Sequence, residues 1–275
     1  MAIEILPIKT AILKKNFNLA DTISEYFVKN GVAPKTGDIL VLSSKIVSVS
    51  QGKVIDLSKI KVGKKAKMFR RTRYGRGKED PRIVELVLRE ADAVLPGTMI
   101  LTLKDGILIP EAGIDLSNIP KGFAVIWPKN PWQTAENLRK KLCHKFNLKN
   151  FGVVICDSHC QPLRWGTTGI AISWAGFEGV EDARGQKDIH GKALKITKKA
   201  VADNLSSSAL LVMGEGGEKI PFVVIRNAPV KFTTRRQKKN EICVNPRDCI
   251  FGGIYSKKFL NLIRLGSRAL VAVGK

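Results

Sequence analysis

Apolar residues recur along the chain with two periods, and these predict both helices and strands. Residues 19–28 carry apolar side chains every three or four positions, which predicts a helix. The apolar run at 39–42 follows a Gly-Asp turn and predicts a strand that continues into a serine-rich loop to residue 48. Asp80-Pro81 is a typical N-cap and first helical residue, and the spacing extends this helix to Val94, just before a proline.

The middle of the chain predicts a hairpin followed by a buried strand. The hairpin covers residues 98–110, and a short strand at 123–127 and an exposed helix at 133–146 come after it. Residues 151–156 are a continuous apolar run typical of a buried strand. This strand delivers Asp157 at its carboxyl end, where mixed sheets commonly hold ligand-binding groups.

The remaining pattern predicts a helix, a loop and a strand in close succession. The elements are a glycine-rich stretch at 165–191, a helix at 196–213, a glycine-rich loop at 214–219, a strand at 221–226 and a closing helix at 257–273. Because strands and helices alternate unevenly and several turns are hairpins, we expect an α+β fold with a mixed sheet and not a doubly wound parallel sheet. We divide it into an N-terminal α/β part, residues 1–150, and a C-terminal α+β part, residues 151–275, which can intertwine.

Length and composition favour a soluble, globular, cytoplasmic protein. The 275 residues, of which 44% are hydrophobic and 26% charged, are enough to bury a substantial core. No apolar run reaches the roughly 18 to 20 residues that span a bilayer, and the first residues lack the pattern of a signal peptide. The five cysteines are an odd number without regular spacing, so we expect free thiols.

The formal net charge is +23, and two basic runs account for much of it. Residues 61–78 hold nine Lys or Arg and no acid, and residues 231–239 hold five more. Such runs attract polyanions, either nucleic acid or phosphorylated small molecules, but they are as often a solvated surface. Aromatic residues do not interleave the runs, so stacking on single-stranded bases has little support.

The segment ICDSHCQPLRWG, residues 155–166, offers three kinds of chemistry. Cys156, His159 and Cys160 could bind zinc if Cys243 and Cys249 completed the set, although structural zinc pairs usually lie in a tight turn and not in a strand. A cysteine nucleophile would need a histidine within hydrogen-bond reach, yet adjacent side chains in extended backbone point apart. A packed, unreactive thiol is the simpler interpretation.

Acidic residues beside glycines favour a metal that bridges protein and phosphate. In this basic chain such acids are few, and they are Asp115, Asp157, Asp182, Asp188 and Glu215. Carboxylates from separate loops are the ligands that Mg²⁺ and Mn²⁺ prefer, although each acid alone also fits a helix cap or turn. The loop GEGGEK has no Walker A pattern and could hold phosphate as a nest of backbone N–H groups or simply cap a helix.

Seven motifs in one order resemble the gamma-glutamyl ligases of coenzyme F-420 biosynthesis, over about residues 1–230. The motifs are SSKIVS, DPRIVELVLRE, GIDLSN, GVVICDSH, RGQKDIHGKALKIT, AVADNL and LVMGEGG. The resemblance implies a ligase that uses GTP and Mg²⁺ or Mn²⁺ to join the lactyl carboxylate of the deazaflavin F-420-0 to the amine of L-glutamate. It implies an acyl phosphate intermediate, with GDP and phosphate released. It also implies a two-domain, intertwined α+β homodimer with sites near the subunit interface.

The resemblance also assigns roles to individual positions. Asp115 and Asp157 match metal-binding aspartates, Ser158 stands where the family has a metal-contacting Thr, and Glu215 is our choice for a further metal ligand. The positions that match nucleotide-contacting residues are Ser44, Lys45, Asn118, Gly214, Gly216 and Gly217.

Several positions depart from the family pattern. The departures are Val49 for a second lysine, NFNL at 16–19 for G-D-D-L, Glu111 for an asparagine, His159-Cys160-Gln161 within D-T-x-G-R-P, and Asn204 for an acid. Most metal and phosphate positions are kept, so a nucleotide-dependent ligase is expected, and its acceptor need not be F-420-0. The alternatives are a nucleic-acid-associated protein and a catalytically silent nucleotide-binding homologue on the same scaffold.

Overall fold

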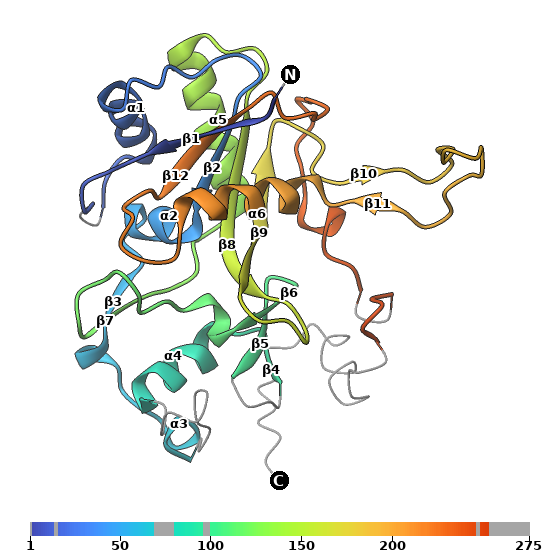
Figure 1. The fold of residues 1–275 in the computed structure, drawn as a ribbon. Coiled ribbons are helices and arrows are strands. Elements are labelled where there is room, and N and C mark those ends of the chain that lie inside the picture. Colours follow the sequence, from blue (N-terminus) through green and yellow to red (C-terminus); the bar gives the residue numbers. More distant parts are fainter. Residues whose placement is uncertain (1, 14–15, 69–79, 96–99, 246–247, 253–275) are drawn as a thin grey trace. The chain divides into compact units, whose positions relative to one another are not determined.

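The computed structural model shows a mixed α/β protein with several sheets (Figure 1). It describes residues 2–13, 16–68, 80–95, 100–245 and 248–252. The chain forms two compact units: the first comprises residues 1–52 and 128–242, and the second comprises residues 53–127 and 243–275. In the described segments we find no helix with both the length and the apolar character to cross a membrane.

A five-stranded mixed sheet organises the first unit. Its strand order is β1-β12-β2-β8-β9, and only β2 and β8 pair in parallel. The strands are β1 (Glu4–Ile8), β2 (Ile39–Ser43), β8 (Gly152–Cys160), β9 (Thr167–Ala175) and β12 (Phe222–Arg226). The expectation of a mixed sheet is therefore confirmed.

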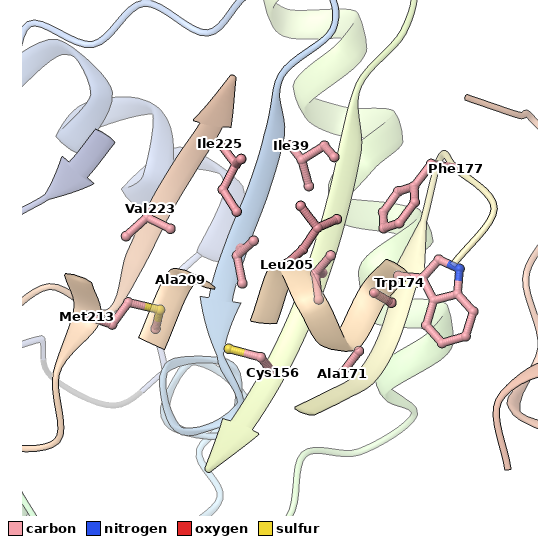
Figure 2. Close-up of a cluster of buried hydrophobic side chains, with 13 residues drawn as sticks. Ile39, Cys156, Ala171, Trp174, Phe177, Leu205, Ala209, Met213, Val223 and Ile225 are labelled. Atoms are coloured by element: carbon pink, nitrogen blue, oxygen red, sulfur yellow. The ribbon is translucent and has the colours of Figure 1, made fainter. Parts of the chain in front are cut away.

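Helices cover both faces of this sheet because its central strands are apolar on both sides. Side chains on one face, among them Ile39 and Val223, pack against Leu205 and Ala209 of α6 (Val201–Met213), as Figure 2 shows. On the other face lie α1 (Leu19–Lys29) and α5 (Pro131–Phe146), and Phe27 of α1 meets Phe222 edge-on. A sheet buried on both faces needs continuous apolar strands, which is the pattern of residues 39–42 and 151–156.

Most sequence-predicted elements of this unit are confirmed, with three corrections. The serine-rich segment after residue 43 is not a loop but the helix α2 (Ser44–Ser50), because the Ser43 hydroxyl accepts the Ile46 N–H as an N-cap. The helix α5 is not an exposed helix, since Leu138 and Leu142 are buried in the core. The helix α6 begins at Val201 and not near residue 196.

Residues just before α6 form a β-arm that extends from the sheet of the same unit (Figure 1). Its strands β10 (Glu181–Asp182) and β11 (Lys198–Lys199) pair antiparallel, and Ala183 N–H donates to Thr197. This pairing holds residues 198–199 in extended backbone and delays the start of α6. Ile189 and Ile196 on the arm are exposed.

In its described residues, the second unit contains two small antiparallel sheets and two α-helices. Strands β3 (Val54–Asp56) and β7 (Phe123–Val125) form one sheet, and β4 (Ala93–Leu95), β5 (Leu101–Lys104) and β6 (Ile107–Pro110) form the other. The helix α4 (Pro81–Glu90) buries Val84 and Val87, and a short helix α3 (Lys64–Met68) precedes it.

The predicted helix start at Asp80 and the hairpin of β5 and β6 are confirmed, but the end of α4 was predicted wrongly. The helix stops at Glu90, and Val94 pairs with Thr102 in β4 instead of continuing the helical face. The predicted helix at 257–273 lies outside the described residues. The predicted boundary between the N-terminal and C-terminal parts, at residue 150, lies between α5 and β8 inside the first unit. The division into these two parts stays a prediction.

Candidate metal and nucleotide site

Four chain segments of the first unit meet at one edge of its sheet. Ser43 at the end of β2 lies opposite Cys156 in the parallel strand β8, so Ser44 and Asp157 both follow at this edge. The antiparallel strand β12 starts here, with Phe222 opposite Leu42, and it brings the glycine-rich loop to the same edge. The topology thus gathers residues that are far apart in the sequence.

Two hydroxyl groups from opposite strands of one hairpin bind the same carboxylate oxygen. Ser158 Oγ on β8 donates to Glu215 Oε1 at 2.7 Å, and Thr167 Oγ1 on β9 donates to the same oxygen at 2.8 Å. This contact joins the glycine-rich loop to the hairpin. Thr167 is absent from the sequence-based assignment, because its place opposite Cys160 depends on a strand pairing that the sequence analysis did not predict.

Asp157 directly precedes Ser158 in β8. It is half-buried, and its Oδ1 accepts the N–H of Ser158 at 2.9 Å. Two neighbouring ligand oxygens around Mg²⁺, each at ~2.1 Å from the ion, are about 3 Å apart. The separation of 2.7 Å between Ser158 Oγ and Glu215 Oε1 is that of an ordinary hydrogen bond, and both atoms are oxygens of the kind that a hard divalent cation binds.

The glycine-rich loop also caps α6. Gly214 follows the helix with φ 70° and ψ −179°, a conformation open only to glycine, and its N–H donates to Leu210. A Cβ at Gly214 would lie 2.3 Å from Cδ of Glu218. The interpretation of the loop as a helix cap is therefore confirmed, and the loop also carries Glu215 to the sheet edge. The phosphate-binding nest stays a prediction.

Ser44 and Lys45 lie in the first turn of α2 at the same edge. Ser44 is buried and Lys45 is half-buried. Gly216 and Gly217 belong to the facing glycine-rich loop, and a Cβ at Gly217 would meet no atom within 4 Å. The first unit therefore brings together all sequence-predicted site residues except Asp115 and Asn118.

Asp115 and Asn118 belong to the second unit, where they form a tight turn. Asp115 pairs with Val125 through two backbone hydrogen bonds, and its Oδ1 accepts the N–H of Ser117 at 2.6 Å. The preceding residues Glu111, Ala112 and Gly113 all have left-handed backbone, with φ of 51°, 55° and 69°. Such a run is uncommon for residues with a Cβ and fixes how the chain enters this turn.

The cysteines of residues 155–166 do not form a reactive site. Burial raises the pKa of the Cys156 thiol well above its usual range, and the nearby carboxylates of Asp157 and Glu215 raise it further. Cys160 is exposed and follows His159 in extended strand. Within the described ranges, no three His, Cys, Asp or Glu side chains form a group that could hold a metal ion. All five cysteines lie in described residues and are thiols, as predicted.

Next to the site, a second polar group joins α6 to β9. Asp203 Oδ1 accepts the N–H of Ala171 at 2.9 Å, beside the bulge in the β8–β9 ladder. Burial raises the pKa of Asp203, and this effect outweighs its hydrogen bond and the nearby His159. Ser207 Oγ donates to the carbonyl of Gly169 at 2.8 Å.

The other acidic candidates and the second basic run have structural roles. Asp182 pairs with Arg184, which lowers the pKa of Asp182 to about 2. Asp188 accepts the backbone N–H groups of His190 and Lys192 in the turn of the arm. Arg235 is bound by the carboxylates of Glu178 and Glu241, so the run at 231–239 is partly neutralised. Of the run at 61–78, only residues 61–68 are described.

Comparison with known proteins shows the family to which the chain belongs. Residues 7–227 match the model of the family F420-0:Gamma-glutamyl ligase. The chain belongs to this family. One relative is the coenzyme F420:L-glutamate ligase of Methanocaldococcus jannaschii, which is 38% identical to this chain over 236 residues. These residues cover 84% of this chain and 90% of the relative.

Two further relatives extend the match. The enzymes of the same name from Methanopyrus kandleri and Archaeoglobus fulgidus are each 34% identical and cover 80% and 84% of this chain. The matched segments make up 86% and 90% of these relatives. The chain is therefore an enzyme of an acid–amino-acid ligase family, and the family match covers most of the first unit and residues 53–127 of the second.

Proposed function

We propose that this protein is a GTP- and divalent-metal-dependent ligase. It joins a carboxylate acceptor, such as coenzyme F420-0, to L-glutamate through an amide bond of the gamma-glutamyl type. Family membership and the printed names of the relatives support the acceptor and the amine. The observation that carries the proposal is the oxygen-rich sheet edge, where Ser158 and Thr167 bind Glu215 beside Asp157.

The reaction needs an activated carboxylate, because a free carboxylate has no good leaving group for attack by an amine. Transfer of the γ-phosphoryl group of GTP to the acceptor carboxylate gives an acyl phosphate and GDP. The amine of glutamate then attacks the acyl carbon, the C–N bond forms, and phosphate leaves with the electrons of the C–O bond. The amine loses one proton, so the products are the amide, GDP and phosphate.

Individual roles follow from the family match and the chemistry of the side chains. We assign Asp115, Asp157, Ser158 and Glu215 as ligands of Mg²⁺ or Mn²⁺, which, when bound, offsets negative charge on the nucleotide phosphates. For contact with GTP we assign Lys45, as a cation near phosphate, and the backbone or side-chain groups of Ser44, Asn118, Gly214, Gly216 and Gly217.

We also propose that the protein forms a homodimer. The arm of residues 181–199 exposes Ile189 and Ile196, and apolar side chains on an extended arm are typical of surfaces that a partner covers. The alternative functions from the sequence are nucleic-acid association and catalytic silence. Nucleic-acid association has less support, because Arg235 of the second basic run is already paired with a carboxylate. Catalytic silence has less support, because the oxygens of Ser158 and Glu215 are in contact at the candidate site.

Mass spectrometry tests the proposal directly. After incubation with GTP, Mn²⁺, L-glutamate and F420-0, we expect the acceptor to gain one glutamate and GDP to appear in equal amount. Asp157→Asn and Asp115→Asn should each lower the rate at least about 100-fold, because metal stabilisation of transition-state charge contributes several kcal/mol. Asp21→Asn on α1 is the matched control and should keep the wild-type rate.

The alternatives predict different results. If GTP binds but no GDP forms with F420-0 or a mixture of other carboxylates, the silent homologue is favoured. If nucleic acid binds with a steep salt dependence and GTP does not bind, nucleic-acid association is favoured. Full activity in both aspartate variants would contradict the metal assignment.

A further inference from the structure

The loop between β8 and β9, residues 161–166, exposes two large apolar side chains. Leu163 and Trp165 are fully accessible, at 106% and 100% relative exposure. Large apolar side chains are usually buried, and a tryptophan covers about 150 to 250 Å² when it is. The loop thus presents an unused aromatic contact surface.

Trp165 differs in this respect from the other tryptophans. Trp127 and Trp174 are buried, and Trp132 packs edge-on against Trp174 with ring centroids 4.7 Å apart. Of the four tryptophans, Trp165 is the one that is neither buried nor packed against another ring in the described residues.

The loop continues directly from the proposed site. Cys160 and Thr167 are the last pair of the β8–β9 ladder, and Thr167 binds Glu215. Trp165 lies two positions before Thr167, so their Cα atoms are within about 7 Å of each other. A molecule that contacts both Trp165 and the oxygen-rich edge therefore has only a short distance to span.

The backbone gives this loop a defined shape. Leu163 has φ 57° and Gly166 has φ 93°, and the N–H of Arg164 donates to the carbonyl of Gln161. Leucine is uncommon in left-handed backbone, so the turn presents Leu163 and Trp165 at a local conformational cost. Between them lies the exposed cation Arg164.

We propose that residues 161–166 bind the acceptor of the ligase reaction, with Trp165 packing against a planar ring and Arg164 facing a negatively charged chain. The inference rests on the proposed function and adds the residues that bind the acceptor. The planar deazaflavin of F420-0 is the ring that would pack against Trp165. A second copy of the chain is the competing occupant of this surface, and the experiment separates the two.

The test measures acceptor binding apart from turnover. Fluorescence anisotropy of F420-0, titrated with protein in the absence of GTP, gives its Kd. Trp165→Ala should raise this Kd about 10-fold or more, as expected for loss of one aromatic stacking contact. Trp165→Phe should stay within about threefold of the wild type, since it keeps a ring. Val28→Ala, which shortens an exposed apolar side chain on α1, is the control.

Kinetics then separate the acceptor from the nucleotide. In Trp165→Ala we expect the KM for F420-0 to rise and the KM for GTP to stay unchanged. A wild type that binds and converts F420-0, with the same Kd in Trp165→Ala, overturns this inference alone. A wild type that neither binds nor converts F420-0 overturns the proposed function and this inference together. A change of oligomeric state in Trp165→Ala with unchanged Kd assigns the loop to a subunit contact.

Discussion

At the scale of single residues, the defining contact is one carboxylate oxygen shared by two hydroxyls. Ser158 and Thr167 both donate to Glu215 Oε1, so the orientation of this carboxylate is fixed from two strands. Hydrogen bonds to a charged group typically contribute about 1.5–3 kcal/mol. In the proposed metal site, these bonds would orient Glu215 as a ligand before the metal binds.

Removal of the Thr167 hydroxyl should therefore weaken metal-dependent activity. We expect Thr167→Val to lower the rate about 10-fold or more at limiting Mn²⁺, with partial recovery at high Mn²⁺. Thr167→Ser keeps the hydroxyl and should keep most of the activity. The measurement is the rate of GDP formation as a function of Mn²⁺ concentration. Equal Mn²⁺ dependence in Thr167→Val and wild type would show that this hydroxyl does not orient a metal ligand.

Asp203 makes stability depend on pH with a definite sign. Burial raises its pKa in the folded protein above the ordinary 3.8, so the folded state favours the protonated acid. Its contribution is greatest below the unfolded-state pKa and is lost as pH rises through the folded pKa. Asp203→Asn mimics the protonated form. The difference in unfolding free energy between this variant and the wild type should therefore shift in favour of the variant as pH rises from 4 to 7. Urea unfolding at both pH values tests this, and a pH-independent difference would contradict it.

At the scale of elements, α6 lies directly on β9 at Gly169. A Cβ at this glycine would lie 2.3 Å from the backbone oxygen of Ser206, so the two elements are in backbone contact. The hydrogen bond from Ser207 Oγ to the Gly169 carbonyl lies at the same place. This close approach holds the helix that leads into the glycine-rich loop.

Gly169→Ala should push α6 away from the sheet. We expect a loss of about 1–3 kcal/mol in unfolding free energy, the usual cost of overpacking. Gly217→Ala is the matched control for stability, because its Cβ would meet open space. Chemical unfolding of both variants measures the difference. Equal stability of Gly169→Ala and wild type would mean that α6 and β9 separate at little cost.

Local pattern predicted elements well where local and tertiary preferences agree. The Asp80-Pro81 start of α4 is such a case, because the Asp80 side chain accepts the Arg82 N–H as a cap. The local pattern gave a wrong prediction at Val94. The spacing of this residue suits a helix, but Val94 pairs with Thr102 in a sheet. Serine-rich composition likewise suggested a loop at α2, although Ser43 caps a helix there. The local spacing of apolar residues does not show which strands will pair, because that pairing depends on other parts of the chain.

At the scale of the whole molecule, the candidate site was predictable only in part. Asp157 follows a strand that its apolar run predicts, and Glu215 stands out as an acid beside glycines. No local pattern brings Glu215 to Ser158, because the contact depends on the order of β12, β2 and β8 in the sheet. Thr167 was missed for the same reason.

The oligomeric state is a property of the whole molecule and can be measured directly. We expect light scattering after gel filtration to give twice the 30.3 kDa mass of one chain. Ile196→Asp, on the exposed arm, should shift the protein toward the monomer, because a charge at an apolar contact is costly to bury. Lys192→Asp on the same arm is the control. A monomer in the wild type would contradict the dimer.

The parallel pairing of β2 with β8 has a consequence for synthesis and folding. The two strands are neighbours in the sheet, but they are far apart along the chain, separated by residues 53–127 and by α5. Closing such a long loop is entropically costly and slow, so contacts of high sequence separation form late. During translation, the emerging β2 has no parallel partner until the ribosome has released the intervening segment and β8. The inserted segment can collapse on its own apolar core meanwhile, and the sheet edge with the candidate site is assembled among the last features of the protein.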